Sequence, residues 1–119
     1  MYNFGSKFGA DPDAAVELLR DARDRGFQAS LAFHPGTQCA DAGPWHAYLT
    51  QAQAIAHQAE VHPMRVNVGG EFPSHRSGAT APNLAAWCRS IGEVHKDFWG
   101  PAALVCGPGH VADAFVLAV

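Results

Sequence analysis

Two segments of this chain end an apolar run with residues that could do chemistry. One runs from Leu31 to Gln38 and the other from Val66 to Pro73, and each passes from aliphatic residues to glycine and polar groups. In α/β proteins the loops at the carboxyl ends of parallel strands converge on one crevice, where ligands bind. We therefore treat the two segments as candidate parts of a single ligand site.

Local chemistry leaves two roles open for each candidate residue. The imidazole of His34 could be hydrogen-bonded and half buried, or it could stack on an aromatic ligand. Thr37 could supply a turn hydroxyl or donate to an anion. Gly69 and Gly70 would let the backbone approach a phosphate closely, although glycine pairs also form ordinary tight turns. A third apolar run ends at 107–109, Gly-Pro-Gly, where the same two interpretations stand.

The remaining reactive side chains follow no catalytic or metal-binding pattern. Five further histidines lie on predicted helices or loops, and no pair among them has the spacing that closes a zinc site; these are His46, His57, His62, His75 and His95. The chain has neither a Gly-x-Ser-x-Gly elbow nor a Walker-type loop. Cys106 ends an apolar run without an evident base, so we interpret it as a small core residue. We expect no metal site and no side-chain nucleophile.

Length and charge narrow the class of protein. The 119 residues make one domain, whereas a complete β/α barrel needs about 250 residues. Eight Lys and Arg against 11 Asp and Glu give a net charge of −3 without a basic stripe, which disfavours nucleic acid and acidic membranes as partners. No apolar stretch approaches the roughly 20 residues of a membrane span, and the start lacks the pattern of a signal peptide.

The cysteines indicate the compartment. Cys39, Cys88 and Cys106 are few, odd in number and widely spaced, which fits neither a disulfide framework nor a zinc pattern. Such usage is typical of a reducing environment, so we expect a soluble, cytoplasmic protein.

Apolar periodicity predicts alternating helices and strands. Asp11 and Pro12 form a good helix start, and Gly26 a stop. The full pattern predicts helices from 12 to Gly26, 44–60 and from 82 to about Gly100, and strands at 28–33, 64–68 and 102–106. The strand ends at His34, Gly69 and Gly107 are separated by 35 and 38 residues, the length of one βα repeat. Right-handed crossovers would place all three strand ends on one side of a parallel sheet.

Four ordered motifs carry a resemblance to a known family. They are Lys7-Phe8-Gly9, Phe33-His34-Pro35-Gly36-Thr37-Gln38-Cys39, Asn67-Val68-Gly69-Gly70-Glu71-Phe72-Pro73-Ser74 and Val105-Cys106-Gly107-Pro108-Gly109-His110. In this order and spacing the chain resembles the ornithine/diaminopimelate/arginine decarboxylase family, whose members are pyridoxal-phosphate enzymes of fold type III. The resemblance covers nearly all of the chain.

The resemblance implies an alanine-racemase-like fold, in which a β/α barrel is followed by a β domain. Residues 1–119 would be a single partial barrel domain of about three βα units, and the last residues would lead into the β domain. The resemblance also implies a homodimer with shared active sites. The histidine motif with its cysteine is more similar to that of ornithine or lysine decarboxylases than to that of diaminopimelate decarboxylases. The implied substrate is therefore a small basic amino acid, in the first place ornithine, and the implied pathway is polyamine biosynthesis.

The resemblance assigns roles to individual residues. His34 matches the histidine that stacks on the pyridoxal ring, and Thr37 matches a serine hydroxyl directed at the cofactor phosphate. Gly69 and Gly70 match the glycine-rich phosphate loop. In the family the substrate loses its α-carboxylate and the cofactor ring accepts the electron pair.

Several positions depart from the family pattern around this cofactor. Glu71 replaces the third loop glycine and brings a negative charge towards the phosphate. Gly107 replaces the glutamate that pairs with the pyridinium nitrogen. After Pro108 and Gly109, His110 replaces an arginine, and a neutral imidazole is a poorer phosphate partner than a guanidinium.

These departures lead to an expectation about activity. Neither Lys7 nor Lys96 matches the family's Schiff-base lysine, which lies on an early barrel strand. We therefore expect the 119 residues alone to be inactive, as a partial gene product, a truncated sequence or a decayed paralogue. Two alternatives stay open: a non-catalytic, antizyme-inhibitor-like binding protein, and a small phosphate-binding α/β domain.

Overall fold

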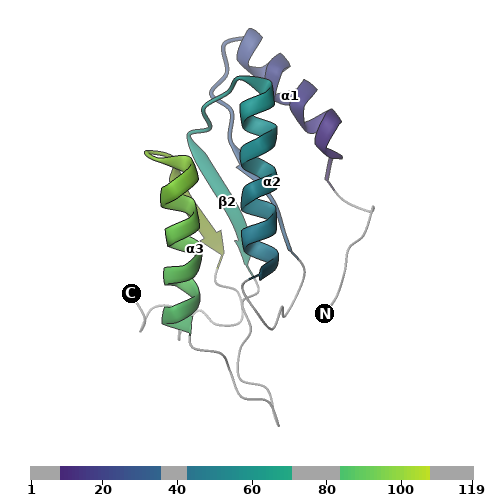
Figure 1. Cartoon of the computed structure of the whole chain (residues 1–119). Helices are drawn as coiled ribbons and strands as arrows, with labels where there is room; N and C mark the ends of the chain where they lie inside the picture. Colours follow the sequence, from purple (N-terminus) through teal and green to yellow (C-terminus); the bar gives the residue numbers. More distant parts are fainter. Residues whose placement is uncertain (1–8, 36–42, 71–83, 108–119) are drawn as a thin grey trace.

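The computed structural model describes residues 9–35, 43–70 and 84–107, which form three helices and a three-stranded parallel sheet (Figure 1). The elements, in chain order, are α1 (Pro12–Asp24), β1 (Leu31–Ala32), α2 (Gly43–Ala59), β2 (Arg65–Gly70), α3 (Leu84–Trp99) and β3 (Ala103–Gly107). The strands are neighbours in sequence order, β1-β2-β3. The predicted α/β class is thus confirmed, and the sequential parallel order with intervening helices agrees with the predicted partial barrel.

The three predicted helices form within about two residues of their expected bounds. At the start of α1 the Asp11 carboxylate accepts the Ala14 N–H at 2.9 Å, as expected of an N-cap. The helix ends before Gly26, which has a φ of +80°. Two arginines of α1 then reach the end of α2: Arg20 donates to Gln58 O at 3.0 Å, and Arg23 donates to Ala59 O at 2.8 Å. These bonds satisfy carbonyls that a helix end leaves unpaired.

The strands differ from prediction in their lengths. The first is regular only at Leu31–Ala32, although pairing continues on both sides through Met64 N–H to Ala29 O and Phe33 N–H to Asn67 O. The second continues two residues past Val68, so that Gly69 and Gly70, predicted to follow the strand, lie within β2. Apolar alternation stops at Val68 because glycine has no side chain, but the backbone pairing continues.

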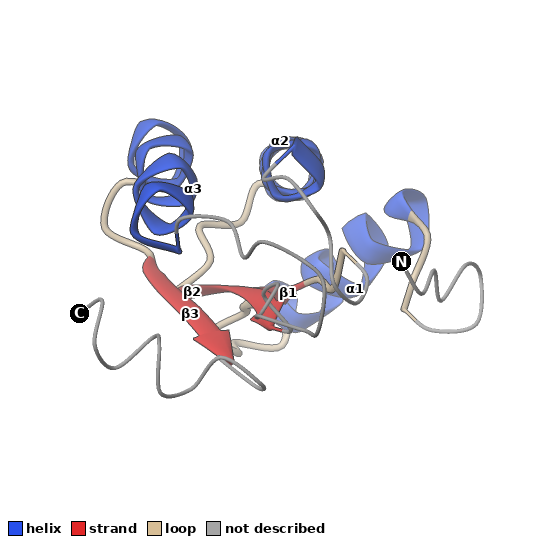
Figure 2. Ribbon diagram, turned by 90° about the horizontal axis from the view of Figure 1, so that it is seen from below, coloured by secondary structure: helices blue, strands red, loops and turns tan. Residues whose placement is uncertain are grey.

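One face of the sheet carries the core. Figure 2 shows α2 and α3 on the same side of the sheet, with α1 beyond β1. The main core cluster joins that face to the two helices; its buried members are Trp45, Leu49, Ala52, Ala56, Val66, Val68, Trp87, Ile91, Trp99 and Ala102. On the opposite face Arg65 and Asn67 are exposed, and no described helix covers them. Within the described residues, no helix is long and apolar enough to cross a membrane.

Candidate functional site at the carboxyl ends of the strands

The three strand ends meet at one edge of the sheet. Gly70 of β2 is paired with Gly107 of β3. On the other side of β2, a Cβ built at Gly69 would lie 3.3 Å from Cα and 3.5 Å from Cδ2 of His34, just beyond β1. Four predicted site residues are therefore neighbours, and the prediction that the strand ends share one side of the sheet is confirmed.

His34 lies on the face of the sheet that the helices leave uncovered. The preceding residue, Phe33, packs against the core and stacks on Tyr48 of α2, with ring centroids 5.3 Å apart. Because side chains alternate along an extended strand, His34 points to the opposite face, where it is exposed. In a barrel that face is the interior, and active sites form where it opens at the carboxyl ends of the strands.

The backbone between β2 and β3 contains a bulge. Asn67 pairs with Val105 and Gly70 with Gly107, so β2 has one more residue than β3 between the two paired positions. Gly69, within the bulge, has a φ of +78°, a left-handed conformation that favours glycine. Its N–H donates to Asn67 Oδ1 at 2.9 Å. The Asn67 side chain thus closes a local turn around the bulge.

The two glycines of β2 leave no room for a side chain. A Cβ at Gly69 would lie 2.9 Å from the carbonyl oxygen of Phe33, and a Cβ at Gly70 would overlap the carbonyl oxygen of Gly107. Gly107 is different, since the atom nearest to its added Cβ is Gly69 O at 4.0 Å. Close strand approach therefore requires glycine at 69 and 70 but not at 107.

The predicted candidates divide into two groups. His34, Gly69, Gly70 and Gly107 are described and lie together. The other four lie outside the described residues; they are Thr37, Glu71, Gly109 and His110. Sequence reasoning missed Asn67, although an Asn two residues before a glycine is the pattern of an Asx turn, which could have indicated it.

The two described cysteines, Cys88 and Cys106, are partly buried. Cys106 is half-buried and packs against the main core cluster. Burial raises the pKa of its thiol, and the neighbouring Cys88 raises it further; burial also raises the pKa of Cys88. The interpretation of Cys106 as a packing residue is confirmed.

These raised pKa values predict slow thiol chemistry. The thiolate is the reactive form, so a raised pKa leaves less of it at neutral pH. In a Cys39→Ser variant, we expect iodoacetamide to alkylate the folded chain more slowly than free cysteine at pH 8, with a rate that keeps rising above pH 9. The same variant in urea should react at the free-cysteine rate. Fast labelling of the folded chain at pH 7 would contradict the burial argument.

The described histidines outside the site do not gather around a metal position. His46 Nε2 lies 2.8 Å from Ser90 Oγ and links α2 to α3, while His95 is buried. His57 and His62 are exposed. Within the described ranges, no group of three or more His, Cys, Asp or Glu residues could hold a metal ion.

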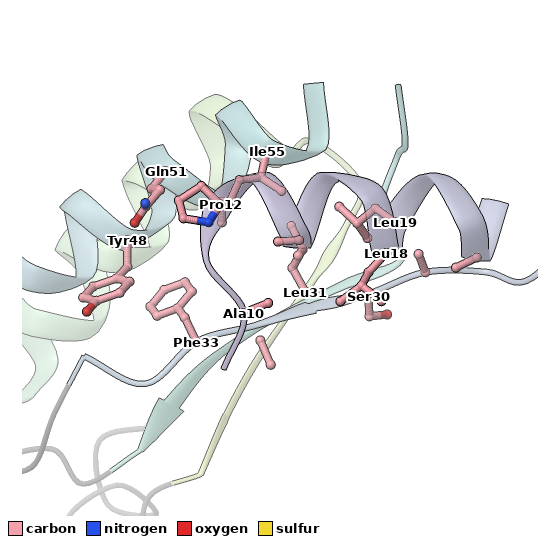
Figure 3. A pocket seen from close by; sticks show the side chains of 15 residues that line it. Ala10, Pro12, Leu18, Leu19, Ser30, Leu31, Phe33, Tyr48, Gln51 and Ile55 are labelled. Carbon is pink, nitrogen blue, oxygen red and sulfur yellow. The ribbon is translucent and has the colours of Figure 1, made fainter. Parts of the chain in front are cut away.

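A separate apolar hollow of about 440 Å³ lies between α1, β1 and α2 (Figure 3). Leu18, Leu31 and Ile55 line it, and the stacked Phe33 and Tyr48 rings stand at one end. Its lining is mostly apolar, with Ser30, Tyr48 and Gln51 as its polar side chains, and it includes none of the described residues that the sequence predicts for the site. We therefore place the candidate site at the strand ends rather than in the hollow.

Comparisons with known proteins point to one family. No protein-family model matches the chain. The lysine/ornithine decarboxylase of Selenomonas ruminantium is 27% identical over 113 residues, which are 92% of this chain and 29% of that protein. The chain thus spans under a third of the length of the curated relative that it matches.

Solved structures agree with the sequence comparison. A crystal structure of the lysine decarboxylase from Selenomonas ruminantium (SrLDC), in complex with pyridoxal phosphate (PLP) and cadaverine, superposes on this chain with a TM-score of 0.75 at 28% identity. The match covers 87% of this chain and 28% of that one. A lysine/ornithine decarboxylase from Vibrio vulnificus, complexed with cadaverine, has a TM-score of 0.76 at 19% identity, covering 89% of this chain and 30% of that one, and so shares the fold.

The parallel sheet with its helices matches a segment of a β/α barrel, and the candidate ligand site lies at the carboxyl ends of its strands. Over this segment the chain is similar, in sequence and in structure, to the fold type III pyridoxal-phosphate-dependent decarboxylases.

Proposed function

We propose that this chain forms the cofactor-facing strand ends of a pyridoxal-phosphate-dependent decarboxylase that acts on a small basic amino acid. The observation that carries the proposal is the meeting of His34, Gly69, Gly70 and Gly107 at one edge of a parallel sheet. This edge is where barrel enzymes build their active sites.

The described residues fit a flat ring with a phosphate. His34 is exposed beside Gly69 and offers a planar ring for stacking. Gly69, Gly70 and Gly107 present backbone without side chains, which permits close approach of an anion. The Gly69 N–H is bonded to Asn67, so it is not among the donors that we assign to the phosphate.

Each residue has a role in the proposal. His34 packs against the cofactor ring, and Thr37 donates its hydroxyl to the phosphate, which Gly70 approaches closely. Glu71 opposes the phosphate charge and weakens binding. At the end of the third strand, the proposed cofactor site is completed by Gly107, Gly109 and His110. Bound there, the cofactor supplies an electron sink for the pair left when the α-carboxylate departs.

The proposed substrate is lysine or ornithine. The structural relatives hold cadaverine or putrescine, the diamines that remain when lysine or ornithine loses its carboxylate. We therefore propose a role in polyamine biosynthesis, in the cytoplasm and as a homodimer, for the protein to which residues 1–119 contribute one partial barrel domain.

On its own the chain is proposed to be inactive. Lys96 is exposed in the last turn of α3, which leads into the amino end of β3 and so lies away from Gly107. Lys7 is outside the described residues. We expect the purified chain, given pyridoxal phosphate and L-lysine or L-ornithine, to release no more CO2 than the protein-free mixture. Sustained release above that control would contradict the proposed inactivity.

Restoring a carboxylate at Gly107 should strengthen the site. Because a Cβ there meets only Gly69 O at 4.0 Å, Gly107→Glu should change the free energy of unfolding by less than about 0.5 kcal/mol. A hydrogen bond to a charged ring nitrogen is worth about 1.5–3 kcal/mol, so pyridoxal phosphate should bind about tenfold more tightly or better. Gly107→Gln, which has the same length without the charge, is the matched control in calorimetry. Equal binding by both variants would count against the site.

A second candidate function is a non-catalytic protein that keeps the scaffold. The observation in its favour is that packing does not require glycine at position 107, so sterics do not explain the missing carboxylate. This candidate predicts that neither the natural chain nor Gly107→Glu binds pyridoxal phosphate. The same titration therefore separates the two functions.

A further inference from the structure

We propose that Asn67 is a positioning residue that sets the phosphate-facing end of β2, an inference that rests on the proposed function. Asn67 lies on the helix-free face, at the residue where the β-bulge begins. Its side chain is neutral and touches no ligand in the proposal. It acts through Gly69.

Three interactions converge on this residue. Its carbonyl oxygen accepts the Phe33 N–H at 2.9 Å, which extends the pairing of β1 towards His34. Its Oδ1 accepts the Gly69 N–H at 2.9 Å. Its pairing with Val105 precedes the register shift towards β3. Asn67 therefore connects the ends of all three strands at the point where they carry the candidate residues.

The Oδ1 bond selects the conformation of Gly69. A residue with φ of +78° leaves the ordinary strand geometry, and its N–H must find an acceptor outside the ladder. Asn67 supplies that acceptor from two residues away, as in an Asx turn. Without the acceptor, the bulge loses its internal support, and the direction in which the chain leaves β2 is less fixed.

The Asn67 side chain is also uncharged, which avoids repulsion of the proposed phosphate. An aspartate would offer the same acceptor to Gly69, but it would add a negative charge beside the proposed phosphate. Glu71 already brings one carboxylate into this segment. Asn67 thus supports the bulge without adding to the repulsion.

Two variants separate the hydrogen bond from the charge. Asn67→Leu keeps the approximate size and removes the acceptor, whereas Asn67→Asp keeps the acceptor and adds the charge. Two readouts apply to each: hydrogen exchange of the Gly69 amide by NMR, and the ratio of Kd values for pyridoxine and pyridoxine 5′-phosphate. These ligands lack the aldehyde, so surface lysines do not react with them. Melting temperatures verify that each variant is folded.

We expect Asn67→Leu to speed exchange at Gly69 and to reduce the preference for the phosphorylated ligand by about fivefold, the effect of losing one hydrogen bond. Asn67→Asp should retain slow exchange at Gly69 yet also lose preference for the phosphate. If Asn67→Leu keeps both slow exchange and the full preference, the inference is wrong. If the natural chain shows no preference for the phosphorylated ligand, the proposed function fails, while Gly69 exchange still decides whether Asn67 holds the bulge.

Discussion

Gly70→Ala is expected to lower the free energy of unfolding by about 3 kcal/mol, because a Cβ there would overlap the carbonyl oxygen of Gly107. Gly70 and Gly107 are paired across the two strands, so neither can move away without separating β2 from β3. For a small domain, whose total stability is about 5–15 kcal/mol, this is a large fraction. Urea unfolding followed by circular dichroism measures it.

Gly92→Ala is the matched control for this substitution. Gly92 lies inside α3, where an added Cβ would meet nothing within 4 Å. Alanine is the better helix former, so this variant should gain about 0.5–1 kcal/mol. If Gly70→Ala lowers the free energy of unfolding while Gly92→Ala raises it, the loss at Gly70 is caused by the contact between the strands. A Gly70→Ala chain as stable as the natural one would refute the close approach of β2 and β3.

Trp45→Ala should lower the free energy of unfolding by as much as Gly70→Ala, or by more. Trp45 is fully buried in α2, and its ring meets Trp87 edge-on with centroids 4.7 Å apart. Its Nε1 donates to Val68 O at 3.1 Å, one residue before Gly69. Removing a buried tryptophan costs about 3–5 kcal/mol through lost contacts and the cavity left behind.

Trp45→Phe distinguishes the two contributions of this side chain. Phenylalanine retains most of the ring packing but leaves Val68 O without its donor, which costs about 1–3 kcal/mol. We expect Trp45→Phe to be intermediate in unfolding experiments between the natural chain and Trp45→Ala. If Trp45→Phe were no more stable than Trp45→Ala, ring packing would not be the main contribution of Trp45 to stability.

The helices and the strand order were predictable because the pattern of apolar side chains along the sequence indicates them. The apolar stripes of α1, α2 and α3 have helical period, and the Asp11-Pro12 start is a local signal. The intervals between strand ends imply parallel crossovers, and the sheet has that order. The length of β2 was not predictable in this way, because pairing at Gly69 and Gly70 involves backbone alone.

The candidate site was predictable in part for the same reason. Sequence alone indicated His34, Gly69 and Gly70 as possible ligand groups, and the structure brings them together. It could not indicate that Gly70 lies against Gly107, because that contact depends on the register between β2 and β3. The bulge at Gly69 and the hydrogen bond that its N–H donates to Asn67 Oδ1 depend on the same register. A steric reason for glycine and a ligand-binding reason therefore coexist at this edge, and binding experiments must separate them.

The central claim is that the strand ends form a phosphate-selective site for the cofactor. Calorimetric titration of the natural chain with pyridoxine 5′-phosphate and with pyridoxine tests it most directly, and His34→Ala and His57→Ala serve as site and surface variants. We predict saturable binding of one phosphorylated ligand per chain, about tenfold tighter than pyridoxine. His34→Ala should weaken both ligands, while His57→Ala, at an exposed position on α2, should weaken neither. Absent binding, or equal binding of the two ligands that His34→Ala leaves unchanged, would contradict the claim.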